Sequence, residues 1–200
     1  MDTKNIPDHP QQGEPWDEKM AHWYVTHYGE HPVNEVAVVA AALVGTETVL
    51  DVGCGGGAAI RAAASRLTTG KAIGIDPSPT MVEISKTGSS SKDISFMEGG
   101  AEALPLLDKS VNVVLAVNSL HHWSNIEKGL GEIARVLRKS GRLIIVEEIF
   151  EEAARGMDSH EVKGVLEKAM FTVSAVTLHE FEDARAHVFL AERSGVKVSV

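Results

Sequence analysis

The chain has 200 residues, of which 44% are hydrophobic and 24% charged, with a formal net charge of -9 at pH 7. This size and composition are typical of one compact domain with a sizeable core. The negative charge would repel a phosphate backbone and no basic run offsets it, so we expect no nucleic-acid partner.

Cys54 is the single cysteine, so the chain has no disulfide framework and no thiolate cluster for a metal. The longest apolar run, Val36 to Val44, is shorter than the roughly 20 residues that a membrane span needs. The polar stretch before Met20 contains no apolar signal-peptide segment. We therefore expect a cytoplasmic protein without a membrane span.

The N-terminal part of the chain divides into two segments. Residues 1–14 are polar and rich in helix breakers, which predicts a flexible arm. Residues 15–45 are expected to form two helices. The first spans Trp16 to Tyr28, and the second opens at Pro32 and ends at Gly45.

From residue 46 onward, apolar runs alternate with runs of helical period, which is typical of βαβ units around a parallel sheet. Ile60, Ala64 and Leu67 share one face of a predicted helix. The expected strands are Thr48–Val52, Ala72–Ile75, Ile94–Glu98, Val111–Val117 and Leu143–Glu147.

A further helix is expected after the fourth strand, with Ser124 as its cap. Its apolar face is predicted to contain Ile126, Leu130, Ile133 and Leu137.

The pattern changes after Glu148. A last helix is predicted over Ser159–Met170. Two β-rich runs follow, Phe171–Leu178 and Arg185–Ala191, and the acidic turn "HEFED" joins them as a hairpin.

The stretch "VLDVGCGGGAAI" places four glycines in five positions behind the first predicted strand. A tight strand-to-helix turn needs fewer glycines, so we expect a ligand that approaches the backbone closely at a helix N-terminus. Gly53, Gly55 and Ala58 also satisfy the spacing of a dinucleotide site, with Asp76 a little over 20 residues later. The loop alone therefore leaves two nucleotide ligands open.

Two aspartates and the chain's end help to separate these ligands. Asp51 precedes Gly53 at the loop mouth, where a carboxylate would repel a pyrophosphate and attract an ammonium or sulfonium. Asp76 ends the second strand and could bind both ribose hydroxyls of an adenosine in either ligand. The chain ends in a hairpin where a dinucleotide domain would continue with more βα units. These features favour a cationic nucleoside.

Five segments carry a resemblance to a known family: "VLDVGCGGG", "AIGIDPSPTMVEIS", "EGGAEALPLLDKSVNVV", "NSLHHW" and "GEIARVLRKSGRLIIVEE". In this order and spacing, from Val49 to Glu148, the sequence resembles class I S-adenosylmethionine-dependent methyltransferases. It is most similar to the small-molecule subgroup of ubiquinone and menaquinone biosynthesis. The resemblance implies an α/β fold: a single Rossmann-like, doubly wound sheet of seven strands in the order 3-2-1-4-5-7-6, with the last strand antiparallel. Residues 46–200 would form this methyltransferase domain and residues 15–45 two lid helices.

The resemblance also implies S-adenosylmethionine as cofactor and a small-molecule methyl acceptor, and it leaves a homodimer open. Asp51 and Gly53 would hold the methionine part, Asp76 the ribose, and the loop of residues 100–102 the adenine. Family members usually carry an acidic residue where this chain has Gly100, which leaves backbone atoms or Glu102 for the adenine amino group. The expected cofactor-binding residues are Asp51, Gly53, Cys54, Gly55, Asp76, Pro77, Met81, Gly100, Ala101, Glu102 and Asn118.

Transfer of a sulfonium methyl group needs orientation, a dry pocket and, for a protonated acceptor, a base. His121 and His122 follow the fourth strand and are the candidate catalytic bases. The alternative is that one of them caps or packs beneath the next helix while Trp123 is buried. Glu147 and Glu148 end the fifth strand, where at least one is expected to be solvated.

The cluster "WDEKMAHWYVTHY" places Trp16, Trp23 and Tyr24 in the predicted lid, where aromatic faces would suit a sulfonium or a planar acceptor. Burial of this helix against the sheet would explain the same residues. The nearby histidines lack the spacing of metal ligands, so we expect no metal site.

Two other functions stay open. A protein that binds S-adenosylmethionine or S-adenosylhomocysteine without methyl transfer would fit the glycine at position 100. An NAD-dependent oxidoreductase would fit the ambiguous glycine spacing.

Overall fold

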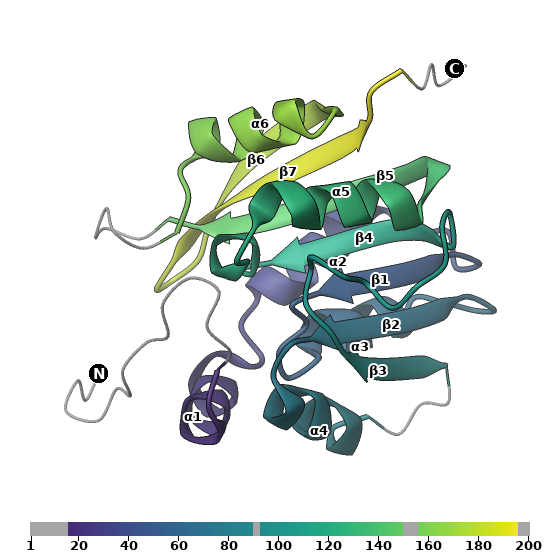
Figure 1. Cartoon of the computed structure of the whole chain (residues 1–200). Coiled ribbons are helices and arrows are strands. Elements are labelled where there is room, and N and C mark those ends of the chain that lie inside the picture. Colours follow the sequence, from purple (N-terminus) through teal and green to yellow (C-terminus); the bar gives the residue numbers. More distant parts are fainter. Residues whose placement is uncertain (1–15, 90–92, 150–155, 196–200) are drawn as a thin grey trace.

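The computed structural model describes residues 16–89, 93–149 and 156–195, so the predicted arm of residues 1–14 lies outside the described residues. Within these ranges the chain forms one seven-stranded sheet in the order β3-β2-β1-β4-β5-β7-β6, with helices on both faces (Figure 1). Strand β7 runs antiparallel to both of its neighbours, whereas the pairs from β3 to β5 are parallel. The predicted α/β fold and strand order are confirmed.

The strand bounds follow the apolar runs of the sequence. Strands β1, β3 and β4 have the predicted limits, but β5 begins at Leu137 rather than at Leu143. The early part of β5 is polar and exposed from Arg138 to Ser140, so hydropathy alone did not reveal it. The strands are β1 (Thr48–Val52), β2 (Lys71–Asp76), β3 (Ile94–Glu98), β4 (Val111–Val117), β5 (Leu137–Glu148), β6 (Phe171–Glu180) and β7 (Arg185–Arg193).

The helices are α1 (Glu18–Tyr28), α2 (Val33–Ala41), α3 (Ala58–Ala64), α4 (Pro79–Thr87), the 3-10 turn η2 (Leu120–His122), α5 (Ile126–Val136) and α6 (Ser159–Lys168). Helix α2 ends at Ala41 because Ala42 adopts a left-handed conformation with φ of 46°. The expected stop at Gly45 was therefore wrong.

The start and end of α5 also differ from the prediction. Asn125 caps the helix, since its side-chain oxygen accepts a hydrogen bond from the backbone N–H of Lys128 at 2.9 Å. Ser124, the predicted cap, instead donates to a carboxylate oxygen of Glu102. Leu137 is the first residue of β5 and not part of the helical face.

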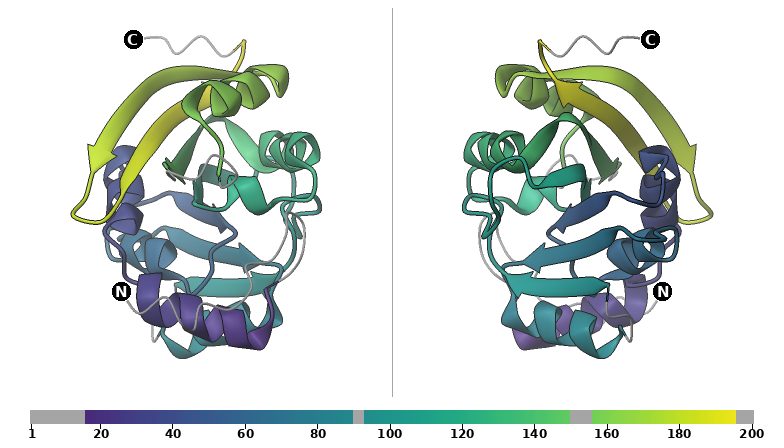
Figure 2. Two further views of the ribbon diagram at one scale, coloured as in Figure 1. Left: turned by 90° about the vertical axis from the view of Figure 1, so that its left-hand side faces the viewer. Right: turned by 90° about the vertical axis from the view of Figure 1, so that its right-hand side faces the viewer.

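The sheet separates two apolar layers, and side chains of the central strands alternate between them. Helices α5 and α6 cover one face, and α2 and α3 cover the other (Figures 1 and 2). In β4, Val114 and Ala116 pack into the first layer, whereas Val113 and Leu115 pack into the second. None of the helices in the described ranges has the length and hydropathy for a bilayer crossing.

The parallel strands end at one common edge of the sheet. Loops after the carboxyl ends of β1, β2, β3 and β4 meet there, and α1 lies beyond this edge and contacts α4 (Figure 1). Ligands of open α/β sheets bind at such an edge. The fold therefore directs attention to these loops.

Arg142 of β5 attaches the end of α2 to the sheet. Its guanidinium donates to the carbonyl of Ala41 at 2.6 Å and to the carboxylate of Glu47 at 2.7 Å. Glu47 also accepts the backbone N–H of Val44 at 2.8 Å. Burial opposes ionisation, but these hydrogen bonds lower the pKa of Glu47. One cation thus satisfies the last turn of a helix and a buried carboxylate.

We predict that Arg142→Met lowers the free energy of unfolding by about 1.5–3 kcal/mol, because a helix carbonyl and the Glu47 carboxylate lose charged donors. Urea denaturation measures this change. Arg138→Met, at an exposed position of the same strand, is the matched control and should change stability by less than about 0.5 kcal/mol. Equal stability of the two variants would show that the contact contributes nothing.

Candidate functional site

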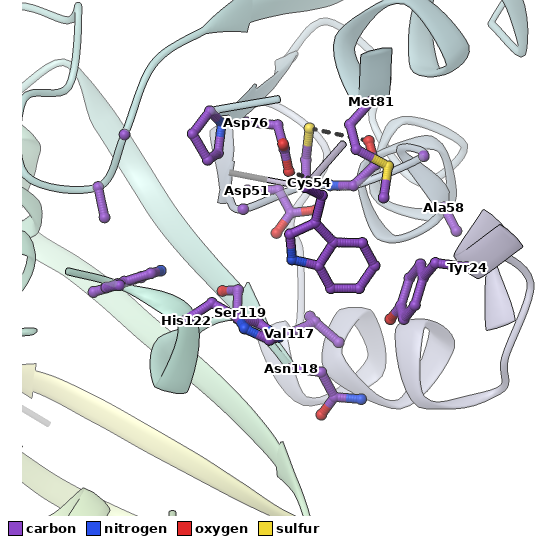
Figure 3. Close-up of a pocket in the computed structure, with 18 of the residues that line it drawn as sticks. Tyr24, Asp51, Cys54, Ala58, Asp76, Met81, Val117, Asn118, Ser119 and His122 are labelled. Carbon is purple, nitrogen blue, oxygen red and sulfur yellow. Dashed lines mark hydrogen bonds between the residues drawn. The ribbon is translucent and has the colours of Figure 1, made fainter. Parts of the chain in front are cut away.

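A cavity of about 350 Å³ lies at the carboxyl edge of the sheet, between the loops after β1, β2, β3 and β4 and helix α1 (Figure 3). This volume is at the low end of the range of about 300–1,000 Å³ that small-ligand pockets occupy. All predicted cofactor-binding residues line it: Asp51, Gly53, Cys54, Gly55, Asp76, Pro77, Met81, Gly100, Ala101, Glu102 and Asn118. The structure brings these residues to one pocket, and their role in binding stays a prediction.

The lining also includes some of the predicted lid aromatics and candidate bases, and residues that the sequence did not single out. Trp16, Tyr24 and His122 line the pocket, whereas Trp23 and His121 do not. Sequence reasoning missed Tyr28, Gly29, Asn34, Gly56, Ala58, Val117, Ser119, Trp123 and Ser124. Several of them lie next to predicted residues in loops, and extending the glycine-loop and "NSLHHW" assignments by one position would have found Gly56 and Ser119.

Positions 53 and 55 of the loop are glycine for different structural reasons. At Gly53, with φ of +73°, an added Cβ would lie 2.6 Å from the Cβ of Ser119, so close packing against the loop after β4 requires glycine. At Gly55, with φ of +50°, no atom lies within 4 Å of an added Cβ. Because Gly55 lines the pocket, its missing side chain leaves space where a ligand can approach the backbone.

Asp76 ties the glycine loop to the end of β2. One carboxylate oxygen accepts the N–H of Gly55 at 2.8 Å, and the other accepts the N–H of Ser78 at 2.9 Å. Burial raises the pKa of Asp76, and the two hydrogen bonds oppose that rise. Each oxygen keeps a second lone pair, so the carboxylate can also accept from a ligand hydroxyl.

Asp51 is the buried acceptor of the site. It is 2% exposed, and its Oδ1 has no hydrogen-bond partner among the described residues. Burial, and secondly the charge of Asp76, raise the pKa of Asp51 to about 7. A buried oxygen without a donor is costly, and a cationic donor would satisfy it. Together with the open space at Gly55, this oxygen fits the ammonium-bearing cofactor that the resemblance implies.

The two candidate bases have different surroundings. Nδ1 of His121 lies 2.6 Å from Oε2 of Glu147, whose Oε1 accepts the N–H of Leu120 at 3.1 Å. Of the two glutamates at this strand end, Glu147 is 1% exposed and is not solvated, whereas Glu148 keeps part of its surface exposed. The ring of His122 packs on His121, with centroids 4.1 Å apart, and reaches the pocket.

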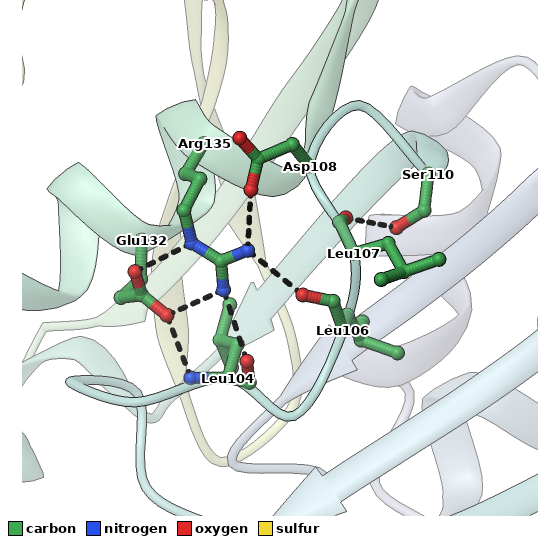
Figure 4. Close-up of polar contacts among 7 residues, drawn as sticks. All are labelled: Leu104, Leu106, Leu107, Asp108, Ser110, Glu132 and Arg135. Carbon is green, nitrogen blue, oxygen red and sulfur yellow. Dashed lines mark hydrogen bonds and ion pairs between the residues drawn. The ribbon is translucent and has the colours of Figure 1, made fainter.

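The loop after β3 is fixed at both ends. Oε1 of Glu102 accepts the hydroxyl of Ser124 at 2.7 Å and the N–H of Asn125 at 2.9 Å, so this oxygen is engaged within the protein. Further along, Arg135 of α5 donates to the carbonyl of Leu106 at 2.8 Å and to that of Leu104 at 3.0 Å (Figure 4). The loop that contains residues 100–102 is therefore held against α5.

Helix α1 closes over the pocket through specific contacts. The carbonyl of Trp16 accepts the hydroxyl of Ser78 at 3.1 Å, and an added Cβ at Gly56 would lie 2.9 Å from the Val25 side chain. The ring of Trp16 meets that of His122 edge-on at 5.5 Å between centroids. Within the described ranges, no group of three His, Cys, Asp or Glu residues is placed to hold a metal ion.

We predict that Asp51→Asn stabilises the ligand-free protein at pH 8. The folded state holds the Asp51 proton up to about pH 7, whereas the unfolded state releases it near pH 4, so this group makes stability fall as pH rises through that window. Since one pKa unit corresponds to about 1.4 kcal/mol, the gain could reach about 4 kcal/mol at pH 8 and should vanish near pH 4.

Urea denaturation at both pH values measures this difference, with Glu83→Gln on the exposed surface of α4 as the control. Equal stability of the wild type and Asp51→Asn at pH 8 would contradict the claim that ionised Asp51 destabilises the ligand-free protein.

Comparison with known proteins agrees with this geometry. Residues 50–145 match a family model described as a methyltransferase domain. The chain is 33% identical over 107 residues to the uncharacterized methyltransferase YcgJ of Bacillus subtilis, covering 52% of this chain and 42% of that protein. It is 41% identical over 103 residues to the demethylmenaquinone methyltransferase of Tropheryma whipplei strain Twist, covering 50% of this chain and 41% of that protein. The chain thus spans less than half the length of these relatives.

The fold has a solved counterpart in a SAM-dependent methyltransferase from Aquifex aeolicus. The two structures superimpose with a TM-score of 0.72 at 24% sequence identity, covering 88% of this chain and 98% of that one. The matched residues 50–145 include the glycine loop, Asp51, Asp76 and the paired histidines. Residues 50–145 therefore carry a methyltransferase domain, and the similarity to S-adenosylmethionine-dependent methyltransferases implies S-adenosylmethionine as its cofactor.

Proposed function

We propose that this protein transfers the methyl group of S-adenosylmethionine to a small-molecule acceptor. The observation that carries the proposal is the buried Oδ1 of Asp51, which lacks a donor at a pocket built by the glycine loop. The ammonium and sulfonium of the cofactor would give this carboxylate a positively charged partner. A pyrophosphate would bring negative charge beside Asp51 and Asp76, which disfavours NAD.

The cofactor contacts follow from the placement of each group. Asp51 and the loop at Gly53 would hold the methionine part, and the free lone pairs of Asp76 would accept the ribose hydroxyls. Because one oxygen of Glu102 is engaged with Ser124 and Asn125, backbone groups of residues 100–102 are the better candidates for adenine contacts. When bound, S-adenosylmethionine supplies an already activated methyl group.

The protein's own contribution is orientation, exclusion of water and proton removal. Helix α1 and Trp16 just before it cover the pocket, with contacts at Gly56 and Ser78, and this cover would exclude water from the reacting atoms. His122 lines the pocket and is the proposed catalytic base. His121, held by the buried Glu147, is a positioning residue because its ring supports that of His122.

The acceptor is proposed to be small because the cavity has only about 350 Å³. The name of the Tropheryma whipplei relative, a demethylmenaquinone methyltransferase, supports a small-molecule acceptor rather than a macromolecule.

A protein that binds the cofactor without transfer is the second candidate, and the missing side chain at Gly100 favours it. Release of S-adenosylhomocysteine in the presence of an acceptor panel separates the two.

We predict that Gly55→Val weakens S-adenosylmethionine binding by at least about 100-fold, because a β-branched side chain would project into the pocket and resist a positive φ. Isothermal titration calorimetry measures the affinity. Gly131→Ala, on α5 with open space around the added methyl, is the control and should bind like the wild type. Normal binding by Gly55→Val, or binding of NAD in place of S-adenosylmethionine, would refute the proposed site.

We predict that His122→Ala lowers methyl transfer by about 10²–10⁴-fold, whereas cofactor affinity changes by less than about twofold. His121→Ala should lower the rate less, by about tenfold, because His121 acts through His122. Wild-type turnover in both variants would contradict a histidine base, and catalysis would then rest on orientation and desolvation alone.

A further inference from the structure

The part of the pocket below α1 is lined by aromatic rings. The rings of Trp16 and Tyr24 meet edge-on with centroids 4.7 Å apart, and Tyr28 follows with its centroid 5.6 Å from that of Tyr24. All three residues line the cavity. Aromatic faces attract cations, and more strongly where water is excluded.

Two carboxylates, those of Glu147 and Glu148, lie near the lining of the cavity. The side-chain amide of Asn118, which lines the pocket, donates to Glu148 at 3.2 Å and accepts the Glu148 backbone N–H at 3.0 Å. Glu147 is buried behind His121, whose ring contacts His122 at the pocket. Both carboxylates therefore lie one contact away from the cavity.

The positive partners near these carboxylates are histidines: His121 pairs with Glu147, and the charges of His31 and His121 act on Glu148. Within the described residues, the lining of the cavity contains no Lys and no Arg. Arg61, which reaches the glycine loop at the carbonyl of Gly56, is paired with Glu30. Burial, and then the charges of Glu148, Tyr28, Asp76 and Glu147, raise the pKa of Tyr24 to about 12. An anion is thus disfavoured at the Tyr24 oxygen, and the carboxylate share of this effect would act in the opposite direction on a cation.

The cofactor compensates only part of this negative charge. S-adenosylmethionine carries one net positive charge, since its sulfonium and ammonium are offset by one carboxylate. The lining contains the carboxyl groups of Asp51, Asp76 and Glu102, and those of Glu147 and Glu148 lie one contact behind it. A site with bound cofactor therefore still favours a second positive charge.

We propose that the methyl acceptor is an amine that enters the pocket as an ammonium ion. Its positive charge would lie among the rings of Trp16, Tyr24 and Tyr28, in the field of Glu147 and Glu148. This inference rests on the proposed function and specifies its substrate class. An acceptor with a carboxylate or phosphate group would find no Lys or Arg among the described residues of the lining.

Methyl transfer to an amine needs no reactant besides the amine and S-adenosylmethionine. The ammonium first loses one proton to the imidazole of His122, the proposed base, which frees the nitrogen lone pair. That pair forms the bond to the methyl carbon while the carbon–sulfur bond breaks and leaves its electron pair on sulfur. The products are a methylated ammonium and a neutral thioether, so no oxidant or further reactant is needed.

Three probes with the same phenyl ring test the proposal: 2-phenylethylamine, 2-phenylethanol and 3-phenylpropionate. Each is titrated by calorimetry into protein saturated with S-adenosylhomocysteine. The amine is expected to bind at least about tenfold more tightly than the alcohol, and the carboxylate is expected to show no binding. Glu148→Gln should weaken amine binding by about fivefold or more without affecting the alcohol. Glu167→Gln, on the exposed surface of α6, is the matched control.

Variants of Tyr24 give a second readout in case Glu148→Gln does not fold. Tyr24→Phe keeps the ring and should keep the preference for the amine, whereas Tyr24→Leu should lose it. Equal or tighter binding of the alcohol or the carboxylate would overturn the proposal, and so would binding of S-adenosylhomocysteine without any of the probes. Failure to bind S-adenosylhomocysteine itself would overturn the proposed function and this inference with it.

Discussion

The buried carboxylate of Asp51 is the constraint on which the site depends. The sheet places it at the end of β1, next to Asp76 at the end of β2, with 2% of its surface exposed and one oxygen without a donor. Neither burial nor a neighbouring negative charge favours the ionised form. In the ligand-free protein this arrangement costs stability, and a cationic ligand relieves it. Loss of stability at a functional site is a common trade-off in proteins.

The loops around this carboxylate form a connected frame. Asp76 holds Gly55, the hydroxyl of Ser119 donates to the carbonyl of Val52 at 2.7 Å, and Glu102 holds the start of α5. Each hydrogen bond joins a loop after one strand to a different element, so the loops cannot move independently. A ligand would therefore meet donors and acceptors that are already positioned, which lowers the entropy cost of an in-line displacement. Helix α1 adds the aromatic wall and closes the frame.

Much of the fold could be predicted from the sequence because apolar runs mark the central strands. The limits of β1, β3 and β4 follow directly from such runs, and the family resemblance supplied the strand order. The predicted cofactor residues meet at one pocket because the carboxyl ends of parallel strands share an edge. In contrast, the polar start of β5 at Arg138 carries no hydropathy signal, since that part of the strand is exposed.

The details that the sequence could not resolve depend on tertiary contacts. Ser124 and Asn125 are both good helix caps, and the contact of Ser124 with Glu102 leaves Asn125 as the cap. Likewise, His121 and His122 are neighbours in sequence, and only the folded chain pairs one with Glu147 and brings the other to the pocket. A glutamate at a strand end suggests solvent, so the burial of Glu147 could not be inferred from its residue type.

Proton release on cofactor binding tests the central claim most directly. Titrating S-adenosylmethionine by calorimetry at pH 6, in two buffers of different ionisation enthalpy, gives the number of protons exchanged. Because the pKa of Asp51 is about 7 without a ligand, most molecules hold this proton at pH 6 and should lose it when the cofactor's ammonium binds. The account predicts release of nearly one proton by the wild type and of none by Asp51→Asn. Tight binding by the wild type without proton release would contradict it.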